Sequence, residues 1–489
     1  MRRFARPFAR LLAVVALLGI AAQPAAAQSI LRDAETEALL RDMVNPLVEA
    51  AGMPKGAVEV VLVHDSSINA FVAGGQRIYV HSGLINAADT ANEVQGVLAH
   101  ELGHITGGHV ISGSQAAGNA MKIQLLSMLA GVAAMLAGSG DAGMAAMALG
   151  QQAAMGTYLS FSRTQEASAD AASVHFLRCA GISGRGAVSF FRKLQNLEFR
   201  YGYSQSDDAG FARTHPLTGD RISRLEADLK DDPAWGGPDA DLVAEFVRPS
   251  APPGDVSRPP AELGSNCAAG PAPTGDMERR FQLAKAKLYG YVAAPAQTLR
   301  SYPEFMTGEP ARYARAYAYH KESRMDDALA EADALIAAEP DNPYFLELKG
   351  QILLESGKPL DALSPLRRAT TLTGNNPLIG SLFAHALMAT EDDSHLAEAE
   401  QVLKGAVGRD RENPAAWYQL GVVYGARGDI PRAQLASAEQ QIMSGRPREA
   451  LHSAESAEQG LPTGSPDWIR AQDVALQARA ELERTGDRN

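Results

Sequence analysis

At 489 residues the chain is too long for one compact domain, so two or three domains are expected. Its hydrophobic content is ordinary for a globular protein, and its abundant alanine favours helices. The formal net charge of −12, without a basic block, argues against a nucleic-acid-binding protein, so no nucleic-acid partner is expected.

Residues 1–27 are typical of a cleaved export signal. A basic start precedes an apolar core at Leu11–Ala22 and a small-residue A-x-A site at Ala25–Ala27. We expect cleavage before Gln28 and export of the mature chain. A retained membrane anchor is the alternative, but the apolar core is short for a spanning helix. Because no cysteine follows the site, a lipoprotein is not expected.

Residues 28–247 are expected to form one α-rich domain with a small sheet. Gln28–Ala51 has a helical pattern. Three β-branched or apolar stretches follow and predict strands: Val58–His64, Ile68–Ala73 and Arg77–His81. The Gly74-Gly75 pair between the last two predicts a hairpin turn.

The stretch Val97–Val110 contains the pattern H-E-x-x-H. Four residues of helix place His100 and His104 on one face, so both imidazoles can bind one metal ion. Glu101 lies beside them, where a general base could reach an attacking water. A surface helix with two solvated histidines is the alternative. The apolar neighbours favour a buried helix instead, and a buried His/Glu set suits zinc.

The local pattern does not name the third metal ligand. His109 lies one residue before the position that the metzincin pattern would use, and on a continuing helix it would face about 180° away from His100. We therefore expect His109 to be a surface or core residue. Glu166 and Asp170 are also four residues apart on a helical pattern. Glu166 could bind the metal while Asp170 orients a ligand histidine through its ring N–H.

Two apolar runs, Met121–Gly138 and Ala142–Met155, predict a helical hairpin. Each run is short for a membrane span, so a buried or membrane-touching hairpin is preferred to a transmembrane one. The methionines of residues 121–155 are adaptable contact residues, so peripheral membrane contact is one expectation. Cys179 and Cys267 could form one disulfide or stay as two thiols, and no C-x-x-C pair suggests metal binding.

Residues 248–275 are rich in Pro, Gly, Ser and Ala, which predicts an interdomain linker. Beyond the linker, D/N/E-N-P motifs end at Pro343, Pro377 and Pro414, spaced by 34 and then 37 residues. A 34-residue helix–turn–helix period is the tetratricopeptide signature. The last repeat carries its W-x2-L-G-x2-Y pattern at Trp417, Leu420, Gly421 and Tyr424. Such solenoids present a concave surface to protein partners, whereas an unrelated alanine-rich bundle is the alternative.

Three motifs together resemble a known family: H-E-L-G-H at His100–His104, E-A-S-A-D at Glu166–Asp170, and T-H-P-L-T-G-D-R-I at Thr214–Ile222. They are similar to the gluzincin metallopeptidases related to the prenyl-protein (CAAX) protease and to HtpX. With the export signal and the repeats, the resemblance covers essentially the whole mature chain. Within this family, the chain most resembles the periplasmic members that act while outer-membrane β-barrels assemble.

The resemblance implies one zinc ion, three zinc ligands and one general base: His100, His104, Glu166 and Glu101. It also implies that Asp170 holds a ligand histidine and that His215 is a removable fourth ligand that closes the site. Arg221 would lie near the active centre. The hairpin over Ile68–His81 would lie beside the cleft and hold an extended substrate by strand addition, with Asn69, Gly74 and Gly75 matching its pattern.

The sequence thus predicts a mainly α protein. A gluzincin-type α+β zinc peptidase domain with a small β-hairpin sheet (28–247) precedes the linker and an all-α tetratricopeptide solenoid (276–486). We expect a periplasmic zinc endopeptidase that cleaves unfolded or misassembled outer-membrane proteins, with the repeats recruiting clients or assembly machinery. Two alternatives stay open: a chaperone or adaptor in which proteolysis is secondary, and a hydrolase of a non-peptide substrate.

Overall fold

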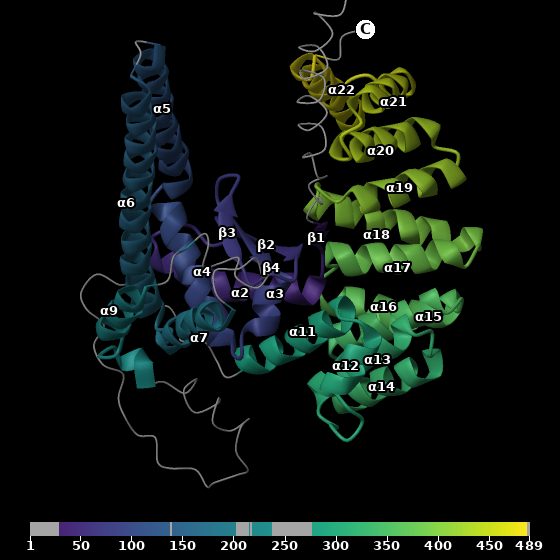
Figure 1. Cartoon of the computed structure of the whole chain (residues 1–489). Helices are drawn as coiled ribbons and strands as arrows, with labels where there is room; N and C mark the ends of the chain where they lie inside the picture. The colour runs from purple at the N-terminus through teal and green to yellow at the C-terminus, as the bar shows by residue number, and fades with distance from the viewer. Residues whose placement is uncertain (1–28, 137–138, 202–214, 216–217, 237–275, 487–489) are drawn as a thin grey trace, which may run out of the picture.

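The computed structural model describes residues 29–136, 139–201, 215, 218–236 and 276–486. The described chain forms an N-terminal part that contains a small sheet and a C-terminal part of stacked helices (Figure 1). This mainly helical architecture confirms the predicted fold class. The expected export signal at 1–27, the linker at 248–275 and Cys267 lie outside the described residues.

The sheet of the N-terminal part has four strands in the spatial order β1-β2-β4-β3. The strands are Ser29–Leu31 (β1), Glu59–His64 (β2), Ala70–Ala73 (β3) and Arg77–His81 (β4). β1 is antiparallel to β2, β2 is parallel to β4, and β3 is antiparallel to β4, so β1 and β3 are the edges. Gly74 and Gly75 form the β3–β4 turn with φ angles of 63° and 97°, which glycine adopts without strain.

The start of the described chain differs from the sequence prediction. The helical pattern predicted a helix from Gln28, but Ser29–Leu31 pairs with β2 as an edge strand. Helix α2 spans only Ala34–Ala50. It begins there because the Asp33 carboxylate caps it, accepting a hydrogen bond of 2.8 Å from the backbone N–H of Thr36.

Most of the other helices of the N-terminal part share one hydrophobic core with the sheet, and α4 lies inside it. They are α3 (Ser82–Ala87), α4 (Ala91–Thr106), α6 (Gly140–Ala180), α7 (Arg185–Tyr201), α9 (Gly219–Leu229) and the 3-10 turn η2 (Pro233–Gly236). Helix α5 (His109–Leu136) packs against α6 instead. Every residue of α4 from Ala91 to His104 is buried. A Cβ atom at Gly103 would lie 2.7 Å from the carbonyl oxygen of Ala169, so α6 lies directly against α4.

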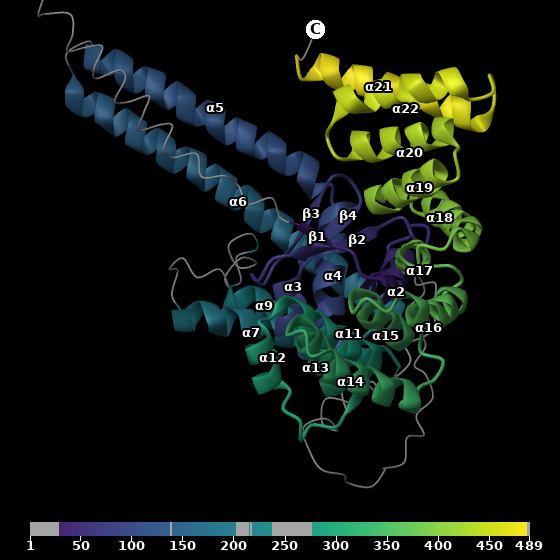
Figure 2. The ribbon, with the colours of Figure 1, turned by 90° about the vertical axis from the view of Figure 1, so that its right-hand side faces the viewer.

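Helices α5 and α6 form a long antiparallel hairpin that projects from the N-terminal part (Figures 1 and 2). We call α5 and the first half of α6 the arm. Large apolar side chains on the arm are exposed, with Met121 at 71% and Leu126 at 67%. The expectation of a buried hairpin is therefore wrong for the described residues. None of the described helices combines the length and the apolar character that a membrane span needs.

The C-terminal part consists of antiparallel helix pairs stacked as in tetratricopeptide repeats (Figure 2). Its helices are α11 (Asp276–Val292), α12 (Pro295–Ser301), α13 (Glu309–Lys321), α14 (Met325–Ala338), α15 (Pro343–Glu355), α16 (Pro359–Leu372), α17 (Pro377–Ala389), η3 (Asp393–His395), α18 (Leu396–Arg409), α19 (Pro414–Ala426), α20 (Ile430–Met443), α21 (Pro447–Gly460) and α22 (Pro466–Arg484).

The repeating N-P motifs mark the starts of α15, α17 and α19. In each helix the proline is the first residue, where its missing N–H costs nothing. The preceding asparagine accepts hydrogen bonds from backbone N–H groups of the first turn: Asn342, Asn376 and Asn413. The 34-residue period is therefore a period of helix caps.

The two parts of the chain are packed against each other. Helix α11 opens the C-terminal part, yet its Phe281 and Leu288 are buried in the hydrophobic core of the N-terminal part. At a second point, the Arg32 guanidinium lies 2.9 Å from the Asp410 carboxylate, which joins the sheet side to the turn between α18 and α19.

Candidate metal centre

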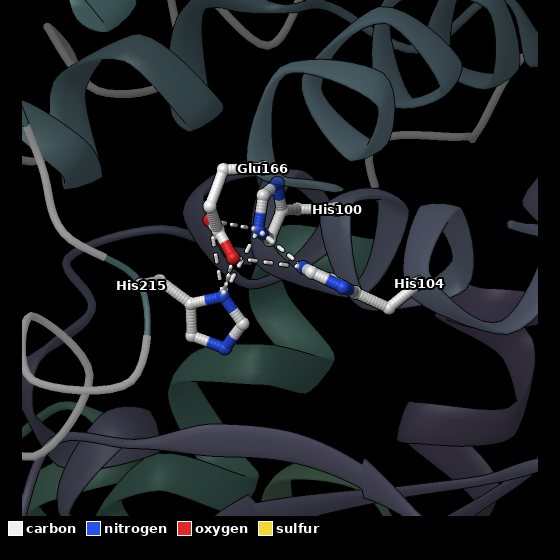
Figure 3. Close-up of side chains that lie close together, drawn as sticks. All are labelled: His100, His104, Glu166 and His215. Atoms are coloured by element: carbon white, nitrogen blue, oxygen red, sulfur yellow. Dashed lines mark hydrogen bonds and ion pairs between the residues drawn. The ribbon is translucent and has the colours of Figure 1, made fainter. Parts of the chain in front are cut away.

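Four buried side chains offer ligand atoms that all lie within 4.8 Å of one another: His100, His104, Glu166 and His215 (Figure 3). Helix α4 supplies the two histidines of the H-E-x-x-H pattern, one turn apart. Helix α6 supplies Glu166, and the chain before α9 supplies His215. Segments more than 100 residues apart thus converge on one point inside the N-terminal part.

The spacing of these ligand atoms fits one small cation. The Nε2 atoms of His100 and His104 are 3.1 Å apart, and each lies 3.4 Å from an oxygen of Glu166. The Nδ1 atom of His215 lies 3.3 Å from His100 Nε2 and 3.0 Å from Glu166 Oε1. Tetrahedral zinc with bonds of about 2.0–2.1 Å holds its ligand atoms about 3.3 Å apart. The residues present therefore fit a zinc-sized ion with four protein ligands.

Asp170 and Arg221 support the ligand group from one side. The Asp170 Oδ1 atom lies 3.0 Å from Nδ1 of His100, on the side of the ring away from the other ligands. Arg221 donates two hydrogen bonds of 2.8 Å to Asp170, and its Nη1 lies 3.0 Å from Glu166 Oε2. One guanidinium thus fixes both carboxylates of α6, a geometry in which planar arginine is favoured.

The charges of this group stabilise positive charge at its centre. Although burial opposes it, the carboxylates of Asp170 and Glu166 raise the pKa of His100 to about 10 in the protein alone. Burial and the neighbouring His100 lower the pKa of His104 to about 2. Burial would raise the pKa of Glu166 and of Asp170. Hydrogen bonds with His100, joined by His215 at Glu166 and by Arg221 at Asp170, nevertheless hold both pKa values well below the usual range. Such a pocket favours a cation.

Glu101 is buried beside the ligand group, and burial raises the pKa of its carboxyl group. Neither carboxylate oxygen accepts a hydrogen bond within the described part of the chain, and His215 Nε2 lies 3.4 Å from Oε1. A buried carboxylate without hydrogen bonds is costly, so its retention points to a reactive role. A carboxylate there can accept a proton from a water held at the cation.

His109 lies outside the ligand group, as expected, but its predicted orientation away from that group is wrong. Its prediction assumed that the helix of His100 continues, but α4 ends at Thr106 and Gly108 takes a left-handed φ of 62°. The chain restarts as α5 in a new direction. His109 Nδ1 consequently lies 2.9 Å from Nδ1 of His104. In the sequence, the Gly107-Gly108 pair is the signal of a helix end that could have prevented the error.

An aromatic ring packs against the ligand group, and the β3–β4 hairpin lies outside that group. Phe191 of α7, which the sequence did not single out, packs edge-on against His100 with ring centroids 5.7 Å apart. Asn69 directly precedes β3, and its carbonyl oxygen accepts a hydrogen bond of 3.0 Å from the backbone N–H of His81. Gly74 and Gly75 form the tip of the β3–β4 hairpin. None of these three residues is part of the ligand group.

A buried helix with H-E-x-x-H, completed by a carboxylate from a second helix, defines a metallopeptidase of the gluzincin type. Residues 34–229 match the sequence profile of peptidase family M48. The matched segment contains His100, His104 and Glu166, so the N-terminal part of the chain is a metallopeptidase domain of the M48 type.

Similar proteins cover either most of the chain or one domain. The β-barrel assembly-enhancing protease of Escherichia coli (strain K12) is 24% identical over 445 residues, which cover 90% of this chain and 82% of that protein. The metalloprotease LoiP of the same strain is 34% identical over 165 residues, 34% of this chain and 60% of that protein. Among solved structures, the tetratricopeptide protein YrrB is 20% identical, with a TM-score of 0.30, over 36% of this chain and 91% of that chain.

Proposed function

We propose that the protein is a periplasmic zinc endopeptidase that cleaves unfolded or misassembled outer-membrane proteins. The observation that carries the proposal is the close grouping of four buried ligand side chains beside Glu101, whose buried carboxylate accepts no hydrogen bond within the described part of the chain. The client class and the compartment rest on the similarity to the β-barrel assembly-enhancing protease over 90% of this chain. The stacked repeats would recruit clients or the assembly machinery, as solenoids commonly bind proteins.

The chemistry assigns a separate task to each group. Bound zinc would polarise the scissile carbonyl and acidify a water. Glu101 accepts the proton of the attacking water and then gives it to the leaving amine, since its raised pKa favours both directions of transfer. The edge strand β3, which contacts α4, can bind an extended peptide through its backbone, with Asn69 at its start.

The Glu101→Gln variant tests the peptidase function. Glutamine keeps the shape of the side chain but cannot accept the proton, so degradation of an unfolded protein should fall at least a hundredfold. A chelator should abolish the same activity. The exposed Glu49→Gln is the control and should cleave at the normal rate. A Glu101→Gln enzyme that keeps full activity would contradict the assignment.

His215 is proposed as a removable cap. A catalytic zinc needs an open position, whereas His215 offers a fourth ligand atom to the group. His215→Ala should therefore raise basal cleavage of unfolded protein several-fold and add a water to the coordination of the metal, which X-ray absorption would detect. Unchanged activity together with unchanged coordination would refute the cap.

A second candidate function is that of a chaperone or adaptor in which proteolysis is secondary. It is favoured by the same fourth ligand, because a filled tetrahedron leaves the enzyme latent. In cells that lack the protein, Glu101→Gln should fail to restore outer-membrane protein assembly if cleavage is the main function. Full restoration by this variant would favour the adaptor.

Peripheral membrane contact through residues 121–155 is also proposed. This segment of the arm exposes apolar side chains and carries few charges. The purified mature chain should float with liposomes of outer-membrane lipids, and replacing Leu126 and Leu129 by serine should weaken that binding. If the substituted protein floats with the liposomes as well as the unaltered protein does, the arm does not contact lipid.

The periplasmic location is tested by cell fractionation. N-terminal sequencing of the mature chain should give Gln28 as its first residue.

A further inference from the structure

His109 lies outside the metal ligand group but contacts one of its members. Its Nδ1 atom is 2.9 Å from Nδ1 of His104, whose Nε2 atom faces the other ligands. On the far side of its ring, His109 Nε2 is 2.9 Å from the hydroxyl oxygen of Ser168. That hydroxyl lies 3.1 Å from the backbone carbonyl oxygen of Gln165. The four groups form one continuous network of hydrogen bonds.

The direction of each hydrogen bond in this network follows from the group at its far end, the backbone carbonyl of Gln165. The Gln165 carbonyl can only accept, so the single hydroxyl proton of Ser168 points to it. Ser168 must then accept from the Nε2–H of His109, which leaves Nδ1 of a neutral His109 as an acceptor. His104 therefore donates through its Nδ1–H. The result is a neutral His104 whose Nε2 lone pair is directed at the cation.

The backbone is shaped to hold His109 in this place. A Cβ atom on Gly107 would lie 2.3 Å from His109 Nε2, so the ring occupies space that only glycine leaves free. The left-handed turn at Gly108 redirects the chain just before it. From α6, the Gln165 side-chain amide donates to the His109 carbonyl at 3.3 Å and to the Ser112 hydroxyl at 2.9 Å. Both helices at the base of the arm thus fix this residue.

We propose that His109, supported by Ser168, is a positioning residue that fixes the tautomer and the ring orientation of the metal ligand His104. It does for His104 what Asp170 does for His100, with a neutral imidazole in place of a carboxylate. The proposal rests on the metal site and not on the identity of the substrate, so it can fail or succeed independently of the proposed peptidase function.

Zinc affinity tests the proposal. The full mature chain is titrated with Zn²⁺ against a chelator of known affinity. Loss of such an outer hydrogen bond typically weakens metal binding about 10–100-fold, so His109→Ala should weaken zinc binding by that factor. His109→Asn, whose amide oxygen can accept from His104 at a similar position, should recover most of the affinity. Zinc binding by His109→Ala with the affinity of the unaltered chain would overturn the proposal.

Substitutions on α6 guard against a merely structural effect. Ser168 is exposed, so Ser168→Ala should fold normally and yet weaken zinc binding several-fold, because it frees the His109 ring. Ser160→Ala, an exposed serine on the same helix, should leave zinc binding unchanged. If the variants at His109 and Ser168 lower only the unfolding temperature of the metal-free protein, and leave zinc affinity as it was, the positioning role is refuted.

Discussion

The carboxylate of Asp170 has two partners that together determine how His100 presents itself to the cation. It lies 3.0 Å from His100 Nδ1 and accepts two hydrogen bonds from the Arg221 guanidinium. In Asp170→Asn the charge is lost and one amide N–H group must face a donor. We expect zinc affinity to fall about 10–100-fold, with peptidase activity at limiting zinc falling in parallel. Titration against a chelator measures the first effect; unaltered affinity would mean that Arg221 alone orients the group.

At the residue scale, local spacing predicted part of the site. His100, Glu101 and His104 follow from helical geometry alone. Spacing proposed Glu166 as a candidate only, since nothing local shows which face of a distant helix meets α4. His109 was misplaced because the helical phase was extended through Gly107 and Gly108, where the chain turns. Helical phase can be trusted only as far as the helix itself.

The approach of α4 and α6 sets the distance between the histidine ligands and Glu166, and Gly103 permits that approach. A Cβ atom at Gly103 would lie 2.7 Å from the backbone oxygen of Ala169, which cannot move aside as a side chain could. Gly103→Ala should therefore cost about 1–3 kcal/mol in the free energy of unfolding. It should also weaken zinc binding, because α6 carries Glu166. Urea unfolding and zinc titration measure the two effects.

Gly156 on α6 provides the matched control. A Cβ atom there would meet no heavy atom within 4 Å, so alanine should stabilise the helix by about 0.5–1 kcal/mol. A Gly103→Ala protein as stable as Gly156→Ala would refute the steric argument.

Helix α6 also has a feature that the sequence did not reveal. Apolar Ala142–Met155 and the Glu166 motif read as separate segments, but no proline interrupts them and they form one 41-residue helix.

At the scale of the whole molecule, a buried cluster of charges joins the two parts of the chain. Lys287 of α11 lies 2.5 Å from Asp33, 3.5 Å from Glu35 and 3.7 Å from Glu347 of α15. The Tyr313 hydroxyl of α13 donates a hydrogen bond of 2.8 Å to Glu35. The repeat period predicted the solenoid from sequence, but the contacts of Asp33 and Glu35 with Lys287 and Tyr313 join residues about 250–280 positions apart, and no local pattern encodes them.

This cluster should make the stability of the packed N-terminal and C-terminal parts depend on pH. Burial raises the pKa of both Glu35 and Glu347 to about 7, against about 4.3 in an unfolded chain. Between these values the folded protein binds protons that the unfolded chain releases, so the stability that these groups contribute is lost as pH rises from about 4.3 through 7. Asp33, whose pKa is lowered, stays ionised over this range and keeps Lys287 paired.

Glu35→Gln tests this dependence, because glutamine still accepts the Tyr313 hydrogen bond but cannot ionise. Urea unfolding at pH 5 to 8 should show a smaller loss of stability with rising pH in this variant than in the unaltered protein, so that the variant is relatively more stable at pH 8. Subtracting the two curves removes titrations common to both, including those of the metal centre. Glu49→Gln, at an exposed position of the same helix, should keep the original pH dependence. Parallel curves for Glu35→Gln and the unaltered protein would show that Glu35 is ionised in the folded state throughout this range.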